Sequence, residues 1–357
     1  MNQHISFCVY YLLNDGYAAQ AGASIYSLFE HNTDLPKLDT WLFTDHVDPD
    51  HLSRILRIGE RFGRTIRTVQ TEEIDRYLKE RYQLDYERCG IGKQRLLLDR
   101  LFVESWLAGR YEYALYLDSD TIVQGSILPA FSRAGDHPLC AAIDIVPKEY
   151  KKAVGLQTQE PYLNSGVLVI NLEKWQERRC EEKMADQVRT GYHQYWYCDQ
   201  DPLNIVLHHE NAGILPLQYN LFPIMSSFDY GNICFLMGRH CRYYSKDEYE
   251  AAKREPVVIH FVYMVQGRPW QAGNRNPYKT LWEEYVQKAG WTEWPCEDMP
   301  HTPKHRFRAA ALKIAGKKGL AFACRLIHLY DSVFIFRQYR RAHAGAWAVQ
   351  KGSVPRG

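Results

Sequence analysis

Two carboxylates separated by one residue, Asp118 and Asp120, follow directly after an apolar run at residues 113–117. If that run is a buried strand, the two acids point to one side of it and Ser119 points to the other. Two carboxylates held together at the end of a parallel strand repel each other unless a cation lies between them. A hard divalent ion, Mn²⁺ or Mg²⁺, would relieve that repulsion and bind phosphate oxygens. The motif alone is more typical of two solvated aspartates in a turn, and the apolar run before it makes the two interpretations equally compatible with the sequence.

A histidine, His260, ends a second short apolar run at residues 257–259. A neutral imidazole at this position could be a third metal ligand, or the ring could be a structural histidine. Gly267 and Arg268 follow in the segment Gly-Arg-Pro-Trp. Glycine allows the backbone to approach a ligand closely, and arginine binds phosphate through two hydrogen bonds. The alternative is a surface turn anchored by Trp270.

Asn164 and Ser165 stand in the segment Tyr-Leu-Asn-Ser-Gly, ahead of an apolar run at residues 167–172. An amide and a hydroxyl at the entrance to a strand could form hydrogen bonds to sugar hydroxyls. The same two residue types are also common in ordinary turns. The sequence therefore makes these residues candidates for sugar binding without deciding between the two roles.

A second candidate pair, Asp199 and Gln200, precedes an aspartate–proline step. Asp201 fits the N-cap of a helix over residues 203–208, with the proline at its first position. Asp199 and Gln200 would then lie on the preceding loop. The positive end of the helix could steady anionic groups there.

The elements that would position these residues alternate between strand and helix patterns. The predicted strands are residues 5–13, 38–44, 65–69, 113–117, 138–145, 167–172 and 257–259. The predicted helices are residues 18–30, 50–62, 96–107, 203–208 and 278–289. This order predicts an α/β fold with a mostly parallel central sheet and helices on both faces. Such sheets bind ligands at the carboxyl ends of their strands.

The composition of the 357-residue chain, 46% hydrophobic and 24% charged, is that of a globular protein and excludes a disordered, collagen-like or coiled-coil chain. Nine irregularly spaced cysteines favour reduced thiols in a cytoplasmic compartment over a zinc cluster or a disulfide framework. The N-terminus lacks the basic start of a signal peptide, and no uncharged stretch of about 18 residues predicts a membrane span. No P-loop or G-x-G-x-x-G segment indicates ATP or NAD.

Charge divides the chain at a proline-rich segment. Residues 304–357 carry twelve Lys and Arg and a single acid, Asp331, whereas the rest of the chain carries nine more acids than bases. We expect a catalytic domain over residues 1–294, a linker over 295–303 and a basic, aromatic helical region over 304–357. One helical stripe of that region comprises Leu320, Ala323, Ile327, Tyr330 and Phe334. We expect the stripe to contact an anionic membrane surface or to pack on the domain. No nucleic-acid partner is expected, because no RNA-recognition motif is present.

Taken in order, these segments resemble the family 8 glycosyltransferases, the group containing glycogenin and bacterial lipopolysaccharide galactosyl- and glucosyltransferases. The resemblance covers about residues 5–290 and rests on the collinear order of motifs that are individually weak. It implies a GT-A fold and a retaining, Mn²⁺-dependent transfer from UDP-galactose or UDP-glucose. The acceptor would be a glycan or glycolipid, such as a lipopolysaccharide or capsule precursor. It also implies a cytoplasmic enzyme that is peripheral on the inner face of the membrane.

The resemblance assigns roles by position. The family's metal ligands correspond to Asp118, Asp120 and His260. Its uridine-contacting segment corresponds to Asp15 and Tyr17, and its donor-sugar contacts to Arg100, Asp144 and Asn164. The pair placed below the anomeric carbon corresponds to Asp199 and Gln200, and the diphosphate-binding lysine to Arg268. We add Ser119, Ser165 and Gly267 to the donor-binding set, since they belong to the same motifs.

The chain also departs from the family pattern. Asn14 stands where many members have an aspartate, and Arg268 keeps the charge of the usual lysine with a different geometry. Arg268 follows His260 by eight residues, two more than in the usual H-x-x-G-x-x-K-P-W, so the insertion at residues 262–266 is expected to reshape the lid over the diphosphate. Two other functions stay open. One is a haloacid-dehalogenase-like phosphohydrolase, which has Thr or Val at the place of Ile122, and the other is a non-catalytic sugar-nucleotide-binding relative.

Overall fold

The computed structural model describes residues 6–35, 37–92, 94–146, 148–157, 159–191, 197–236, 243–294, 296–299 and 302–342. Pro295 and Pro300 of the expected linker, Cys241, and the tail beyond residue 342 lie outside these ranges. For residues 335–342 only the backbone is described. The proposed division at residues 295–303 stays a prediction.

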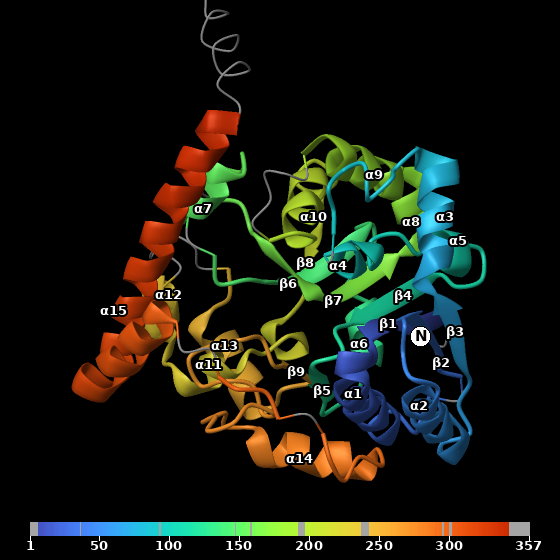
Figure 1. Cartoon of the computed structure of the whole chain (residues 1–357), viewed down its shortest axis with the longest axis horizontal. Helices are drawn as coiled ribbons and strands as arrows, with labels where there is room; N and C mark the ends of the chain where they lie inside the picture. The colour runs from blue at the N-terminus through green and yellow to red at the C-terminus, as the bar shows by residue number, and fades with distance from the viewer. Residues whose placement is uncertain are drawn as a thin grey trace, which may run out of the picture.

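Seven strands form the central sheet in the order β3-β2-β1-β4-β7-β6-β8 (Figure 1). They are β1 (Phe7–Asn14), β2 (Asp39–Asp45), β3 (Ile66–Gln70), β4 (Tyr113–Leu117), β6 (Leu139–Ile143), β7 (Leu163–Asn171) and β8 (Gly213–Ile214). Strand β1 is parallel to β2 and β4, β2 to β3, and β6 to β8, whereas β7 runs against both β4 and β6. The expected mostly parallel α/β sheet is therefore confirmed. Because β7 is antiparallel, its beginning lies beside the carboxyl end of β4.

Helices cover both faces of the sheet. The side chains of β1 alternate between two cores: Tyr10 packs in one, and Tyr11 packs in the other. On the Tyr11 face lie α1 (Ala18–Glu30), α2 (Pro49–Arg61) and α14 (Lys279–Lys288). On the Tyr10 face lie α3 (Thr71–Tyr82), α9 (Cys180–Gly191) and α10 (Gln200–Leu207). The inner strands are thus buried on both sides, which explains why they are continuous apolar runs, whereas the edge strand β3 is mostly exposed.

Shorter helices connect these elements. They are η1 (Asp15–Tyr17), α4 (Arg95–Asp99), α5 (Glu104–Leu107), α6 (Leu128–Phe131), α7 (Lys148–Ala153), α8 (Leu172–Glu177), η3 (Leu217–Tyr219), α11 (Pro223–Ser227), α12 (Tyr230–Leu236) and α13 (Lys246–Arg254).

The single helix predicted over residues 96–107 was wrong, because the structure has α4 and α5 with a break between them. In a continuous helix the amide of Glu104 would donate to the carbonyl of Arg100. Instead, the Glu104 amide donates to the Glu181 carboxylate at 2.9 Å, and the Arg100 carbonyl accepts from the Tyr10 hydroxyl at 2.8 Å. Tertiary partners therefore replace the helical hydrogen bond. Arg100, at the break, contacts Asp118 at the end of β4.

A separate two-stranded ladder joins β5 (Thr121–Val123) to β9 (Val258–His260). The strands are antiparallel, and the register pairs Thr121 with His260. The amide of Phe261 also donates to the carbonyl of Asp120 at 2.8 Å. This pairing brings two segments that are about 140 residues apart in the sequence to one point, directly after the end of β4.

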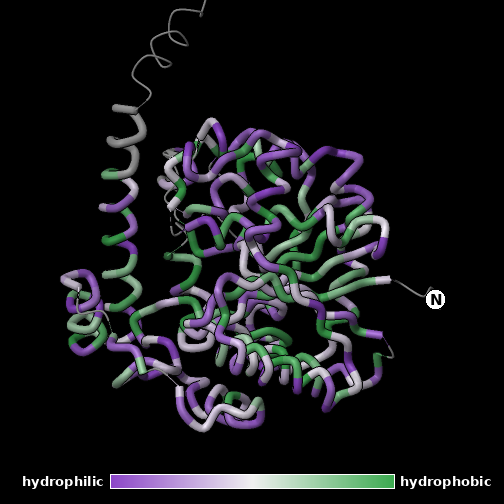
Figure 2. The backbone as a smooth tube through the Cα atoms, turned by 45° about the vertical axis from the view of Figure 1, so that its right-hand side comes forward, coloured by the Kyte–Doolittle hydropathy of each residue, from purple (hydrophilic) through white to green (hydrophobic). Residues whose placement is uncertain are grey.

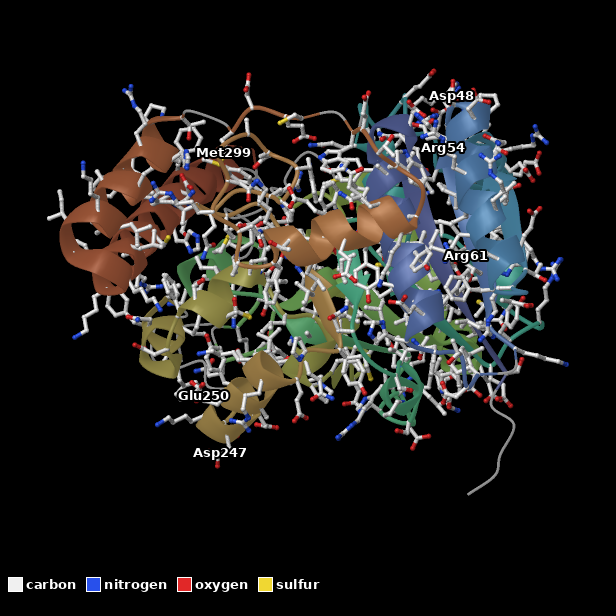
Figure 3. All side chains as sticks on the ribbon, turned by 90° about the horizontal axis from the view of Figure 1, so that it is seen from below. Asp48, Arg54, Arg61, Asp247, Glu250 and Met299 are labelled. Atoms are coloured by element: carbon white, nitrogen blue, oxygen red, sulfur yellow. The ribbon has the colours of Figure 1, made fainter. Side chains whose placement is uncertain are left out.

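The C-terminal helix α15 (Pro303–Ala342) is a hairpin rather than one rod. Ala315 and Gly316 have non-helical backbone angles, and Gly316 has a φ of 59°. Lys304 forms an ion pair with Asp331 at 2.5 Å, 27 residues later, whereas a continuous helix would separate them by about 40 Å. We call residues 303–314 the first arm and residues 317–342 the second arm. Seen from below, α15 lies at the opposite end of the molecule from Arg54 and Arg61 of α2 (Figure 3).

Packing divides the predicted apolar stripe of α15 into two parts. The second arm packs against α7 and α12 (Figure 1), and Leu320, Ala323 and Ile327 are buried there. Tyr330 and Phe334 are instead 68% and 47% exposed. Next to Tyr330, the side chain of Asp331 contacts Lys304 of the first arm. The stripe therefore packs on the body over its first half only. Figure 2 shows hydrophobic and hydrophilic residues mixed along this helix. In the part of the chain that the structure describes, no helix has the length and apolarity to cross a membrane.

Candidate active site

Asp118, Asp120 and His260 meet at the carboxyl end of β4. One potential ligand atom from each lies within 4.8 Å of the others. The Nε2 atom of His260 is 3.3 Å from Asp118 Oδ2 and 3.2 Å from Asp120 Oδ1. The β5–β9 register explains the proximity, since it places the histidine directly beside the second aspartate. The sequence prediction that these three residues form one cluster agrees with this geometry.

The orientation of His260 is set by Asn220, which the sequence analysis missed. The Nδ1 atom of His260 lies 2.9 Å from Asn220 Oδ1, so an Nδ1–H donor leaves Nε2 free to accept a metal. Asn220 is itself fixed, because its amide nitrogen donates to Asn164 Oδ1 at 2.8 Å. Asn220 is 1% exposed and follows helix η3. A lone asparagine at the end of a Gln-Tyr-Asn segment carries no sequence signal that would have identified it.

A glycine makes room for the three side chains. A Cβ atom at Gly166 would lie 2.2 Å from His260 Cε1 and 2.7 Å from Asp118 Oδ2. The carbonyl of Gly166 accepts from the Asp118 amide at 2.8 Å, which anchors the strand. Gly166 is therefore required by the cluster itself, because any side chain would occupy the space of two ligands.

Charges in the cluster balance one another. Burial alone would lower the pKa of His260, but Asp120 and Asp118 outweigh burial and raise that pKa to about 9. Burial would likewise raise the pKa of Asp118, yet the Arg100 guanidinium, followed by His260, holds it well below its usual range. Asp118 is thus ionised at neutral pH. A divalent cation could replace the imidazolium proton as counter-charge, and two carboxylates with one imidazole suit Mn²⁺. The residues present therefore fit a metal ion.

Arg100 organises one side of the cluster. Its Nη1 atom is 2.8 Å from Asp118 Oδ1, an oxygen that also accepts from the Tyr116 hydroxyl at 2.6 Å. Asp118 Oδ2 is consequently the oxygen that faces His260. The Nε atom of Arg100 lies 3.5 Å from Asp199 Oδ2. Arg100 thereby connects a metal-ligand candidate to a catalytic candidate.

Arg268 approaches the cluster from the other side. Its Nη2 atom is 3.6 Å from Asp120 Oδ2, and its Nη1 atom donates to the Tyr17 hydroxyl at 2.8 Å. The preceding Gly267 has a φ of 75°, and a Cβ there would lie 2.5 Å from Met299 Sδ. Gly267 is therefore needed for the turn that aims Arg268 at the metal-ligand candidates. Arg268 and Tyr17 therefore form one polar side of the metal-ligand cluster.

Asp15 lies on η1, immediately after β1. Its Oδ1 accepts from the Asp48 amide at 2.9 Å and from His51 Nδ1 at 2.8 Å. Burial acts to raise the pKa of Asp15, but these two hydrogen bonds outweigh burial and lower it. Asp15 and Tyr17 therefore form an ordered, partly anionic rim next to Arg268. The hydroxyl of Ser119 points elsewhere and donates to the Leu12 carbonyl at 3.0 Å.

A polar network joins the donor-sugar candidates. Gln200 Nε2 donates to Asp144 Oδ2 at 2.8 Å, and Gln200 Oε1 accepts from Asn164 Nδ2 and from the Ser165 amide, both at 3.1 Å. Asn164 Nδ2 also lies 3.1 Å from Asp144 Oδ2. Through Asn220, this network continues to His260. The structure therefore links the predicted sugar contacts to the predicted metal ligands by a chain of side-chain hydrogen bonds.

Asp199 is buried beside this network at the N-cap position of α10. Burial is the main reason that its pKa is raised, with Arg100 opposing the rise. Among the described residues, its Oδ2 atom has no hydrogen-bond donor, and its ion pair with Arg100 Nε is long, at 3.5 Å. A buried carboxylate oxygen without a donor is costly to maintain and is typical of a functional position.

The family model described as "Glycosyl transferase family 8" matches residues 8–273. The chain belongs to glycosyl transferase family 8. One similar protein is the lipopolysaccharide 1,2-glucosyltransferase of Escherichia coli, 27% identical over 65% of this chain and 68% of that protein. Another is general stress protein A of Bacillus subtilis, 21% identical over 82% of this chain and 94% of that protein. Membership of the family favours the transferase over the dehalogenase-like phosphohydrolase considered above.

Solved structures show the same fold. The galactosyltransferase LgtC, in complex with donor and acceptor sugar analogues, aligns with a TM-score of 0.61 and 21% identity, covering 81% of this chain and 97% of that chain. The bifunctional glycosyltransferase WbbM aligns with a TM-score of 0.64 and 18% identity, covering 82% of this chain and 51% of that chain. The GT-A fold implied by the sequence resemblance is confirmed by this likeness.

Two local expectations for this family 8 chain were wrong. Asp201 is not the N-cap of α10: it lies in the first turn, buried, and accepts hydrogen bonds from the Tyr150 and Tyr162 hydroxyls. Asn164 and Ser165 lie within β7 rather than in a turn before it. The pairing of Leu163 with Ile143 of β6 extends the strand to include them. Cross-strand partners decided the strand boundary, and local propensity did not.

Proposed function

We propose that this family 8 chain is a metal-dependent, retaining hexosyltransferase that moves galactose or glucose from a UDP-sugar to a glycan acceptor. The observation that carries the proposal is the convergence of two carboxylates and an imidazole on one point, with Arg268 on one side and the Asn164–Gln200–Asp144 network on the other. Such an arrangement offers one place for a cation with a diphosphate and an adjacent place for a sugar.

The difficult step is the departure of UDP from the anomeric carbon. A divalent ion bound by Asp118, Asp120 and His260 would supply Lewis-acid neutralisation of the charge developing on the β-phosphate. Arg268 adds a fixed guanidinium beside the same phosphate, and its hydrogen bond to Tyr17 holds it in place. Removing one such preorganised partner typically costs about 3–4 kcal/mol, or about 10²–10³ in rate. Asp15 and Tyr17 would bind the uridine, and Asp144 and Asn164 the sugar hydroxyls.

Retention can proceed by two routes that assign different roles to Asp199. Gln200 is a poor nucleophile, because a neutral amide is weakly nucleophilic and its carbonyl oxygen already accepts from Asn164 and Ser165. Asp199 is the better candidate for a covalent route. Attack by the acceptor on the same face, with the leaving phosphate as base, needs neither residue. Asp199→Asn tests this point: loss of all turnover supports the covalent route, and substantial residual turnover supports front-face attack.

The names of the relatives supply the substrate classes. The similar E. coli protein is a lipopolysaccharide 1,2-glucosyltransferase, and LgtC is a galactosyltransferase. We therefore propose glucose or galactose as the donor sugar, and a lipopolysaccharide or capsule precursor as the acceptor. Because such precursors are assembled at the inner face of the membrane, we also propose that the enzyme acts there, in the cytoplasm.

The outer side of α15 supports membrane contact. Phe322, Leu326, Tyr330 and Val333 recur at spacings of four, four and three, and they are 56%, 40%, 68% and 52% exposed. Exposed apolar residues at this spacing form one face of a helix. Exposed lysines precede this face at the start of the second arm. Each cation near an anionic headgroup contributes about 1 kcal/mol, so the second arm can lie on the membrane while its inner side packs on α7 and α12.

The catalytic proposal is tested with a panel of UDP-sugars in Mn²⁺ and in EDTA. We expect slow hydrolysis of UDP-galactose or UDP-glucose with Mn²⁺ and none with EDTA. Asp120→Ala should abolish hydrolysis without lowering the melting temperature by more than a few degrees, whereas Asp247→Ala, at an exposed position on α13, should behave as the wild type. Unchanged hydrolysis in Asp120→Ala contradicts the assigned role. Tight UDP binding without turnover, even with candidate acceptors, supports the non-catalytic alternative.

The membrane proposal is tested by co-sedimentation with vesicles containing anionic lipid. The double variant Leu326→Glu/Tyr330→Glu should lose most vesicle binding, because it places two acids on the outer face of α15. Leu128→Glu, at a position 38% exposed on α6, is the control and should bind as the wild type. Equal binding by the double variant would remove α15 from the proposed membrane contact.

A further inference from the structure

The first arm of α15 lies against the loop that connects the metal-ligand candidate His260 to Arg268. His305 Nε2 is 3.4 Å from the carbonyl of Val265 in that loop. His305 is 7% exposed, so the contact is an internal one. The C-terminal region is therefore in direct contact with the lid of the predicted diphosphate site.

Arg308 lies one turn after His305, on the same side of the first arm. It is half-buried, and its Nε atom is buried with no hydrogen-bond acceptor among the described residues. No ion pair involving Arg308 occurs in that part of the chain. A buried guanidinium N–H without an acceptor is unfavourable unless a ligand supplies one. Arg308 thus has the environment of an anion-binding residue.

Electrostatic effects on two tyrosines indicate which groups lie near Arg308. Burial raises the pKa of Tyr263, and the charges of Arg308 and Arg268 oppose that rise, so this tyrosine lies near both cations. Burial and the carboxylate of Asp144 raise the pKa of Tyr197, while Arg308 opposes the rise. The Tyr263 hydroxyl is buried without a partner among the described residues, and the Tyr197 side chain is exposed.

The described groups around Arg308 leave it without a carboxylate partner. The buried Cys324 thiol of the second arm accepts a hydrogen bond from Arg308, but burial raises the pKa of this thiol, so it stays neutral and supplies no counter-charge. Asp331, the acid of the second arm, is already paired with Lys304 at 2.5 Å. Burial, followed by the charge of Arg308, lowers the pKa of His328 to about 4, so this histidine is neutral at pH 7. Its Nδ1 atom is also buried without a partner in the described part of the chain. Two buried polar atoms of α15, Arg308 Nε and His328 Nδ1, therefore have no hydrogen-bond partner among the described residues.

We propose that Arg308, together with Tyr197 and Tyr263, binds an anionic substituent of the acceptor glycan. The inference rests on the proposed glycosyltransferase function and adds the chemistry of its acceptor: a sugar carrying a phosphate or a carboxylate. Arg268 lies 3.6 Å from the metal-ligand candidate Asp120, whereas Arg308 lies on α15. The two arginines therefore serve different ligands. Tyrosine rings beside a guanidinium suit a charged sugar, because rings contact the sugar face while the cation binds its acid.

The test uses the full chain saturated with Mn²⁺ and UDP, so that the donor site is filled. Isothermal titration calorimetry measures the binding of glucose 6-phosphate, glucuronate and methyl glucoside. We expect at least one acidic sugar to bind tenfold or more tightly than methyl glucoside, and the comparison of the two acids distinguishes phosphate from carboxylate. In Arg308→Gln the preference should disappear. Arg306→Gln, two residues away and exposed, should keep it.

Each outcome decides the point. No preference in the wild type, or an unchanged preference in Arg308→Gln, overturns the assignment. Arg308→Gln could also loosen α15, which would be seen as a lower melting temperature. In that case Arg308→Lys decides, because it keeps the charge and should retain a several-fold preference for the acidic sugar. Loss of the preference in Arg308→Lys also overturns the assignment. UDP-sugar hydrolysis by the wild type is measured separately. Absent hydrolysis with intact acid preference refutes only the catalytic function, and intact hydrolysis without acid preference refutes only the acceptor site.

Discussion

Replacing Gly166 by alanine should disable the metal-ligand cluster while leaving every ligand in the sequence. The added methyl group would lie 2.2 Å from His260 Cε1 and 2.7 Å from both His260 Nδ1 and Asp118 Oδ2, whereas ordinary contacts begin at 3.4 Å. The strand cannot yield easily, because β7 is paired on both sides and Gly166 accepts from the Asp118 amide. The imidazole must therefore retreat by roughly 1 Å, a displacement that can cost about 10²-fold in rate.

The retreat also weakens the hydrogen bond that orients the imidazole, since Asn220 is only 2.9 Å from His260 Nδ1. We expect Mn²⁺ affinity to fall by about 10- to 100-fold, as when an outer-shell partner is lost. Overpacking should lower the free energy of unfolding by about 1–3 kcal/mol. Titration of Mn²⁺ followed by electron paramagnetic resonance measures the first effect, and chemical denaturation measures the second.

Gly125→Ala is the matched control for this experiment. It lies just after β5, and its Cβ would meet only Val257, at an ordinary distance of 3.6 Å or more. It should bind Mn²⁺ as the wild type does. If Gly166→Ala also binds Mn²⁺ with wild-type affinity and hydrolyses UDP-sugar at the wild-type rate, the close packing of β7 against the three ligands is not what shapes the site.

Two further predictions concern Asn220 and Glu181. Asn220→Ala removes the acceptor for His260 Nδ1 and the donor to Asn164, so Mn²⁺ affinity should fall about 10- to 100-fold; a titration showing wild-type affinity would contradict the orienting role. Burial, followed by the charge of Glu104, raises the pKa of Glu181 from 4.5 to about 8. The folded carboxyl keeps its proton where the unfolded chain has lost it, so the unfolding free energy should fall as pH rises from about 4.5 to about 8. The free energy of unfolding of Glu181→Gln should lack this slope and should exceed that of the wild type by a few kcal/mol at about pH 8.5. If chemical denaturation shows the same pH dependence for both proteins, the raised pKa of Glu181 is refuted.

Much of the fold was predictable because its elements carry strong local patterns. The buried strands are continuous apolar runs, and α1 begins and ends where the sequence indicated, at Ala18–Glu30. Elements whose ends depend on distant partners were less predictable. The break between α4 and α5 arises because Glu181 and Tyr10 compete for the helical hydrogen-bond groups of Glu104 and Arg100. No window of local sequence contains that competition.

The candidate site shows the same division. Asp118 and Asp120 were identified from the sequence because the strand that precedes them is apolar and the acids are two residues apart. The contribution of Asn220 could not be predicted, since an asparagine in a short connecting segment looks like any other turn residue. Gly166 is also indistinguishable in sequence from a turn glycine, yet it is a strand residue that makes room for two ligands.

By itself, the order of residues along this chain determined its α/β class, the acids at the end of β4 and the basic character of its C-terminal region. Hydrophobic patterns and local charge depend on residues that are neighbours in the sequence, so they can be recognised without the folded structure. Tertiary structure alone decided that His260 lies beside Asp120, because a β5–β9 register is a pairing of segments far apart in the chain. It also decided that α15 folds back and brings His305 against the loop between His260 and Arg268, since Gly316 permits a hairpin but only packing against the body selects its direction.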